Sequence, residues 1–291
     1  MIRQFKLRAS LICFCGLAFF SVSGGKTNEI QSAPAIGQST RLKHIIEKKK
    51  IQIGLQVQEP LVVTNEERPG IDVELAKQIA ADLGVEAEII FALPNQLITM
   101  VNQGQVDLAL GGISSNMERG LKVRFTRPYL IATAGGLLNR NRIPTESESI
   151  EFTKRKISTL RDLQIPGKLV VAVRSDTTNE ELLRTATRFS TFQIETFMTN
   201  QDALNALRNN KVDMLVADDI WIRYAIKTSP DLLSRFLPIV GIYREEHISA
   251  AIPPGDMEFW HVIDFMIKEY QRTGMMNRIV ERYYDVTRDL R

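Results

Sequence analysis

Apolar and polar residues alternate with two different periods from about residue 43 onward. Ile51 to Leu55 alternates with period two, as a half-buried strand does. From Asp72 to Leu83 the apolar residues recur on one helical face, and Gly84 supplies a stop signal. Further elements are predicted in the same way, namely a strand at 85–91, a helix capped by Asn95 and ended at Gly104, and a strand at 106–110.

The second half of the chain repeats this order of elements. Strands are predicted at 169–173 and 212–217, with helices starting at Thr177 and spanning 202–208. In both halves the last strand runs into a polar loop, at 111–116 and at 218–219. Ligands bind at the carboxyl ends of strands in open α/β sheets, so two such edges predict a cleft. The stretch 258–284 predicts two packing helices separated near Gly274.

The first residues predict export. Arg3, Lys6 and Arg8 precede an uncharged run at 9–20, and small residues follow. The run is too short for a spanning helix, which needs roughly 20 apolar residues. Residues 1–25 are therefore predicted to be a signal peptide, and 26–42, rich in Ser, Gln, Pro and Gly, a tether. The expected location is periplasmic or extracytoplasmic.

Composition excludes several classes of function. Both cysteines, Cys13 and Cys15, lie in the signal, so the mature chain has no disulfide and no thiolate. A lipid anchor is disfavoured, because large residues precede both cysteines. The signal holds three of the 37 basic residues and none of the 34 acidic ones, so the remainder is balanced. That balance argues against a nucleic-acid partner. The three histidines are not spaced as metal ligands, and we expect no metal and no cofactor.

Several polar residues after the strands suit an α-amino acid. Its carboxylate favours an arginine fork and helix N-terminal amides, and its ammonium favours an aspartate. The candidates are Ser114, Ser115 (in a capping box with Glu118), Asn116, Arg119, Thr177, Thr178 and Asp218. Each alone has an ordinary structural interpretation as a surface ion-pair partner, a helix cap or a loop residue. Their occurrence after matching strands favours a binding site.

Residues 43 to 286 resemble the extracellular solute-binding proteins of family 3, the polar amino-acid binders of ABC importers. The matching stretches, in family order, are 70–76, 104–107, 114–119, 125–129, 175–178, 212–218 and 273–283. The resemblance implies an α/β, two-lobed periplasmic-binding-protein-like fold (type II) with two crossing hinge strands, near 129–133 and 244–250. Lobe 1 would comprise 43–131 plus 248–291, and lobe 2 would comprise 132–247.

The same resemblance implies roles for residues. Arg119 would clamp the ligand carboxylate, assisted by Ser114 and the backbone at Gly112, with Asn116 where the family often has threonine. Thr177 and Thr178 would contact the carboxylate from the other lobe, and Asp218 would hold the ammonium. The implied partners are a small-molecule ligand and an ABC permease, and we expect a monomer without enzymatic activity.

Five positions depart from the family pattern. Gln58, and Leu93 or Pro94, stand where aromatic walls usually stack on the ligand, and Asp176 replaces a usual glycine. Arg124 and Arg127 replace common acidic residues, either as surface substitutions or as a basic cleft mouth that would favour an acidic ligand. These changes leave the ligand's identity open, and a peptide or a cell-wall fragment stays among the candidates.

Two alternative functions are kept. Some relatives on this fold are dehydratases of cyclic dienols, for which Glu180, Glu245 or Asp219 would be the candidate acid. The same lobes also serve as ligand sensors. The chain ends soon after the last predicted helix without a kinase or hydrolase domain, which favours a receptor.

Overall fold

A computed structural model describes residues 39–63, 67–143, 167–186, 192–239 and 245–285. The predicted signal peptide and most of the predicted tether lie outside these residues. The last tether residues are helical, because Ser39 caps α1 (Thr40–Lys48) and Leu42 and Ile45 are buried one turn apart. The folded part therefore begins a few residues before the predicted position.

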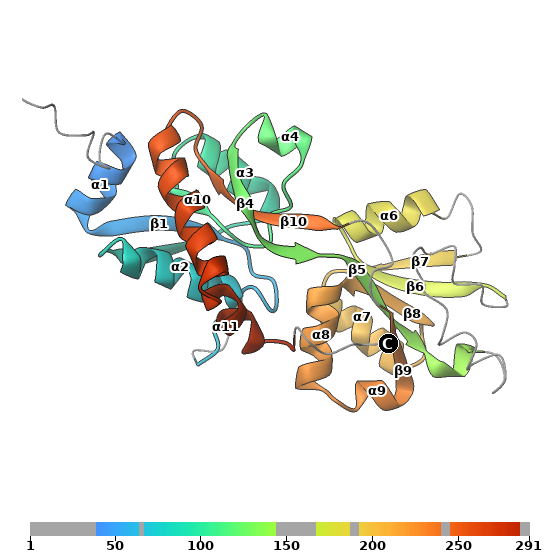
Figure 1. Cartoon of the computed structure of the whole chain (residues 1–291). Coiled ribbons are helices and arrows are strands. Elements are labelled where there is room, and N and C mark those ends of the chain that lie inside the picture. The colour runs from blue at the N-terminus through green and yellow to red at the C-terminus, as the bar shows by residue number, and fades with distance from the viewer. Residues whose placement is uncertain (1–38, 64–66, 144–166, 187–191, 240–244, 286–291) are drawn as a thin grey trace, which may run out of the picture. The chain divides into compact units, whose positions relative to one another are not determined.

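The first sheet has five strands in the order β2-β1-β3-β10-β4 (Figure 1). The strands are β1 (Lys50–Leu55), β2 (Glu86–Phe91), β3 (Leu108–Ala109), β4 (Arg124–Ala132) and β10 (Glu246–Ile252). β1 is parallel to β2 and β3, whereas β10 is antiparallel to β3 and β4. The carboxyl ends of β1 and β3 therefore lie at one edge of the sheet.

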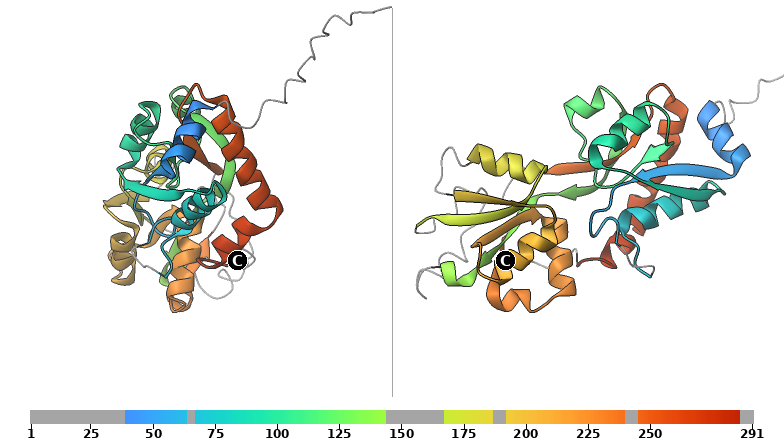
Figure 2. Two further views of the ribbon diagram at one scale, coloured as in Figure 1. Left: turned by 90° about the vertical axis from the view of Figure 1, so that its left-hand side faces the viewer. Right: turned by 180° about the vertical axis from the view of Figure 1, so that it is seen from behind.

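Helices cover both faces of this sheet. On one face α2 (Ile71–Asp82), α10 (Met257–Arg272) and α11 (Met275–Glu281) share a core in which Leu75, Ile79 and Phe259 are fully buried. Burial of each such side chain contributes about 1.5–3 kcal/mol. On the other face α3 (Pro94–Asn102) buries Leu97 and Val101. Figure 2, in the view from behind, shows α3 on the face opposite to α10.

The second sheet repeats this plan in the order β7-β6-β8-β5-β9. Its strands are β5 (Ala134–Asn139), β6 (Leu169–Arg174), β7 (Phe192–Phe197), β8 (Met214–Asp218) and β9 (Phe236–Ile239). β6 is parallel to β7 and β8, and β5 is antiparallel to β8 and β9. α6 (Thr178–Ala186) covers one face, and α7 (Asn200–Arg208) and α8 (Asp219–Thr228) cover the other (Figure 1). The short helices η1 (Arg140–Arg142) and α9 (Leu232–Arg235) complete this half.

The chain passes from one sheet to the other at Thr133, between β4 and β5. This is the first predicted crossing. The return runs from β9 into β10, and its residues 240–244 lie outside the described part. Two mixed α/β sheets joined in this way confirm the predicted fold class. The exact lobe boundaries stay a prediction, although Ala132 and Glu246 both belong to strands of the first sheet.

The start of one helix differs from the prediction, and the break between two others agrees with it. The helix predicted to be capped by Asn95 begins instead at Pro94, with Leu93 as its N-cap, because the fixed φ of proline suits the first helical position. Gly274 separates α10 from α11 with φ of 70°, as predicted. Within the described ranges, every helix is too short or too polar to cross a membrane.

Candidate functional site

The loop that follows β3 carries the first group of predicted site residues. Gly111 and Gly112 have φ of 106° and 68°, which residues with side chains rarely adopt. A Cβ on Gly111 would lie 2.8 Å from the backbone nitrogen of Gln56, and one on Gly112 would lie 2.5 Å from Leu61 Cδ1. Glycine at both positions therefore lets this loop pack closely against the residues after β1.

Asp72 of α2 anchors the same loop from within the core. Its side chain is fully buried (0 % exposed), and its Oδ2 accepts hydrogen bonds from Gly111 N–H at 2.6 Å and Gly112 N–H at 3.1 Å. Burial raises the pKa of Asp72 to about 7, and the Tyr129 hydroxyl and the two glycine N–H groups oppose that rise. The loop is thus tied to α2 and, through Tyr129, lies close to the crossing strand β4.

Arg119 reaches the loop from the short helix α4 (Met117–Gly120). Asn116 Oδ1 accepts a hydrogen bond from Arg119 N–H at 2.9 Å and caps the helix. The Arg119 guanidinium donates through Nη1 to the Ser114 carbonyl at 3.0 Å. The predicted Ser115–Glu118 capping box is wrong, because the helix starts one residue later and Asn116 supplies the cap.

Thr177 and Thr178 lie where β6 passes into α6. Thr177 Oγ1 accepts from Glu180 N–H at 3.2 Å and so caps this helix. Asp176, where the resemblance implies a glycine, has φ of 56°. Glycine adopts this left-handed conformation most easily, and aspartate tolerates it better than most residues. The backbone shape of a glycine position is therefore kept, and the added carboxylate is exposed.

Asp218 ends β8 directly before α8. Its Oδ1 accepts a hydrogen bond from Asn179 Nδ2 at 2.8 Å. Burial raises the pKa of Asp218 to about 6, and the Glu246 carboxylate raises it further, whereas Asn179 and Arg174 lower it. A carboxyl group with a pKa of about 6 is mostly ionised at pH 7. It is therefore an anionic acceptor for a cationic ligand group.

One cavity of about 670 Å³ joins these groups. The predicted site residues that line it are Gly112, Ser114, Asn116, Arg119, Thr177, Thr178 and Asp218. The first four come after β3 of the first sheet, Thr177 and Thr178 follow β6 of the second sheet, and Asp218 is the last residue of β8. The structure thus brings these seven residues together, while their contacts with a ligand stay a prediction; Ser115, the other candidate, does not line this cavity.

Further polar residues line the same cavity, among them Gln56, Gln58, Arg174, Asn179 and Glu246. Of these five, only Gln58 was placed at the ligand from the sequence, where the family resemblance implies an aromatic wall. Gln58 Oε1 accepts from Gln56 Nε2 at 2.9 Å and from Arg174 Nη2 at 3.4 Å. Gln56 and Arg174 stand at strand carboxyl ends, the signal already used for Asp218. Glu246 lies at the start of a strand, so a search for polar residues at the carboxyl ends of strands does not identify it.

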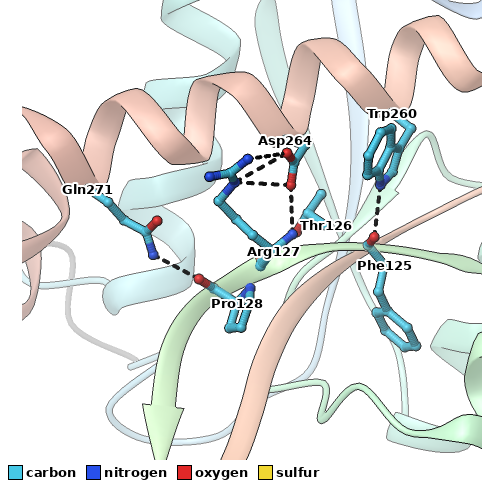
Figure 3. A network of polar contacts seen from close by, with 7 residues as sticks. All are labelled: Phe125, Thr126, Arg127, Pro128, Trp260, Asp264 and Gln271. Atoms are coloured by element: carbon cyan, nitrogen blue, oxygen red, sulfur yellow. Dashed lines mark hydrogen bonds and ion pairs between the residues drawn. The ribbon is translucent and has the colours of Figure 1, made fainter.

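Arg127 has a structural role away from the cavity. Its guanidinium forms a two-pronged ion pair with Asp264 of α10, with Nη2 at 2.7 Å from Oδ2. The backbone N–H of Arg127 donates to Asp264 Oδ1 at 2.7 Å (Figure 3). Nearby, Trp260 Nε1 donates to the Phe125 carbonyl. Arg127 does not line the described cavity, so its substitution fits the surface interpretation rather than a basic cleft mouth.

A larger hollow of about 1240 Å³ lies beside α1, lined mainly by α1, β1 and residues 253–258. Its charged walls are partly paired internally, since Arg41 contacts Asp107 at 2.6 Å and Ser39 donates to Asp256 at 2.6 Å. None of the predicted site residues lines it. Across the described ranges no group of three or more His, Cys, Asp or Glu side chains is arranged to hold a metal ion.

Known proteins show similar sequence and structure. The arginine-binding extracellular protein ArtP of Bacillus subtilis is 27 % identical over 215 residues, covering 74 % of this chain and 77 % of that protein. A cyclohexadienyl dehydratase of Pseudomonas aeruginosa is 23 % identical over 259 residues, covering 88 % and 90 %. The structure of an ancestral cationic amino acid solute binding protein superposes with a TM-score of 0.69 at 24 % identity, covering 84 % of this chain and 99 % of that one.

The model of one family matches residues 51–286, which is most of the chain. The match includes every residue of the candidate site and, apart from Lys50, both sheets. The chain belongs to the bacterial extracellular solute-binding proteins, family 3.

Proposed function

We propose that this protein is an exported receptor that captures an α-amino acid between its two sheets for delivery to an ABC permease. The observation that carries the proposal is the cavity itself. It has the Arg119 guanidinium on a wall from the first sheet and the Asp218 carboxylate on a wall from the second. A zwitterion needs both charges, because leaving either of its ends unpaired in a buried site is costly.

Each wall has a suitable role. The Arg119 fork and Ser114 would bind the ligand carboxylate from the first sheet. Thr177 and Thr178 stand at the N-terminus of α6, where N–H groups and the helix dipole favour an anion. Asp218 would accept hydrogen bonds from the ammonium. Because these contacts come from both sheets, a ligand favours the closed arrangement, which a permease could recognise.

Export is supported by residues 1–25 and by the family, whose members are described as extracellular. We infer a signal peptide there, a periplasmic or extracytoplasmic location without a lipid anchor, and a monomeric receptor. The balanced charge of residues after 25 supports a small-molecule ligand rather than a nucleic acid.

The carboxylates named for a dehydratase are poorly suited to donate a proton. Glu180 pairs with Arg184 at 2.6 Å, and this contact holds the pKa of Glu180 below its usual value. Asp219 accepts from Thr133 N–H at 2.8 Å and pairs with Arg223. Glu245 is exposed. These environments support binding without catalysis. Conversion of arogenate or prephenate by the purified protein would contradict the proposal that the protein binds its ligand without catalysis.

The test of the proposal is a thermal-shift screen of the mature chain, residues 26–291. The panel holds the proteinogenic amino acids, dipeptides and muropeptides at equal concentration. A ligand present at 100 times its Kd stabilises the folded state by about 2.7 kcal/mol, so a specific ligand produces a clear rise in Tm. We expect a free amino acid to give the largest rise. A rise with muropeptides alone would refute the amino-acid assignment.

A further inference from the structure

We propose that Glu246 is a specificity-determining residue, which together with Asp218 makes the cleft select a ligand with a second cationic group beside its α-ammonium. This inference rests on the proposed amino-acid function and names the ligand's class. The class is a diamino or guanidino acid with a net charge of about +1.

Strand register brings the two carboxylates to the same place. Glu246, at the start of β10, is paired with Ala132 of β4, and Asp218, at the end of β8, is paired with Ala134 of β5. Ala132 and Ala134 are only two residues apart, roughly 6–7 Å along a strand. Glu246 and Asp218 thus reach the crossing segment from different sheets, and both line the cavity. Their proximity also shows in the effect of Glu246, which raises the pKa of Asp218.

The Glu246 carboxylate has acceptor capacity to spare. Its Oε2 accepts a hydrogen bond from Ser114 Oγ at 2.5 Å. Among the described residues, Glu246 forms no ion pair with a lysine, arginine or histidine side chain. The nearby Arg119 guanidinium donates to the Ser114 carbonyl instead. A neutral hydroxyl leaves the negative charge of Glu246 uncompensated, and a ligand cation would compensate it.

The cavity wall as a whole carries an excess of negative charge. Its carboxylates are Glu118, Asp176, Glu180, Glu181, Asp218 and Glu246, against the guanidinium groups of Arg119, Arg174 and Arg184. Two of these carboxylates are already paired with basic side chains, Glu118 with Lys122 and Glu180 with Arg184. A zwitterion with a neutral side chain leaves the excess unchanged, whereas an acidic ligand increases the repulsion. Only a cationic ligand reduces it.

The experiment compares ligands that differ in charge but little in shape. Calorimetry measures the affinity of the mature protein for L-arginine and L-citrulline, whose urea group replaces the guanidinium, and for L-lysine and L-norleucine. Loss of a hydrogen bond to a charged group costs about 1.5–3 kcal/mol, which is about 10- to 100-fold in affinity. We expect each cationic ligand to bind more tightly than its neutral counterpart by that factor.

Glu246→Gln keeps the shape of the side chain and removes its charge. We expect it to reduce the arginine-to-citrulline ratio to within about threefold while citrulline affinity is kept. Glu269→Gln on α10, outside the cavity, is the matched control and should keep the wild-type ratio. Citrulline binding by Glu246→Gln also reports that the variant is folded.

Distinct outcomes separate the two claims. If no amino acid binds the wild-type protein, the proposed function fails, and this inference fails with it. If neutral or acidic amino acids bind as tightly as cationic ones, the inference alone is overturned. It is also overturned if Glu246→Gln weakens citrulline and arginine equally, because Glu246 would then contact only the shared α-ammonium.

Discussion

The buried Asp72 predicts an unusual dependence of stability on pH. Its pKa is raised to about 7 in the folded chain, chiefly by burial, from an ordinary value of 3.8. Between these two values the folded state holds a proton that the unfolded state does not. The free energy of unfolding therefore falls as pH rises, with a slope of about 1.4 kcal/mol per pH unit for one proton. The stabilisation is fully present below pH 3.8 and is lost as pH rises through about 7.

The magnitude follows from these values. From pH 8 to pH 5, protonation of Asp72 contributes about 2–3 kcal/mol to the free energy of unfolding. Asp218, with its pKa raised to about 6, adds about 1 kcal/mol over the same interval. The side chain of Asp72→Asn cannot titrate. From pH 8 to pH 5 the free energy of unfolding of this variant should therefore rise only by the contribution of Asp218.

Urea unfolding of the ligand-free mature protein at pH 5, 6, 7 and 8 measures the pH dependence of the free energy of unfolding directly. Asp231→Asn, at an exposed position, is the control and should follow the wild type. Equal wild-type stability at pH 5 and pH 8 would refute the reasoning. So would an Asp72→Asn variant that keeps the full wild-type slope.

Two further predictions concern the loop and the crossing strand. Gly111→Ala should lower the free energy of unfolding by more than the about 1–2 kcal/mol that left-handed backbone costs alanine, and should weaken ligand binding, because a Cβ would lie 2.8 Å from the backbone nitrogen of Gln56. Gly84→Ala is the control for the backbone cost, because Gly84 has φ of 69° and an added Cβ would meet no atom within 4 Å. If urea unfolding shows the same loss of stability for both variants, the packing argument is wrong. Arg127→Ala should lower the free energy of unfolding by about 1–2 kcal/mol, because it leaves the Asp264 carboxylate, which is only 10 % exposed, without its partner. The value is kept at this level because the Arg127 side chain is itself 38 % exposed, so that solvent screens the pair. Arg272→Ala removes an exposed pair and should lower the free energy of unfolding by less than Arg127→Ala does, so equal losses would show that burial of Asp264 does not matter.

Local pattern was enough to predict much of the fold. The apolar spacing of α2, the alternation in β1 and the break at Gly274 each depend on residues close in sequence, and each is found in the structure. The start of α3 was misplaced because Pro94 sets the first helical position before the polar Asn95. The cap of α4 was misplaced by one residue, since Asn116 competes with Ser115 for the same role.

The candidate site was predictable where it follows strand ends. Arg119 and Thr177 come after predicted strands and Asp218 ends one, so their place in the sequence, together with the family resemblance, pointed to the cavity. Glu246 was not predictable in this way, because it enters the cavity through the pairing of β10 with β4, residues more than 100 positions apart. The exposed carboxylate of Asp176 could be weighed only once its left-handed φ was known.

The central claim is that Arg119 and Asp218 hold the two ends of one zwitterion. Calorimetry of Arg119→Ala and Asp218→Ala, with the amino acid that gives the largest thermal shift, tests it most directly. Removal of one partner of a buried charged contact costs about 3–5 kcal/mol, so each variant should lose on the order of 10²–10³ in affinity or more. Arg272→Ala, outside the cavity, should bind as the wild type does. Unchanged affinity in both Arg119→Ala and Asp218→Ala, in variants that unfold like the wild type, would contradict the account.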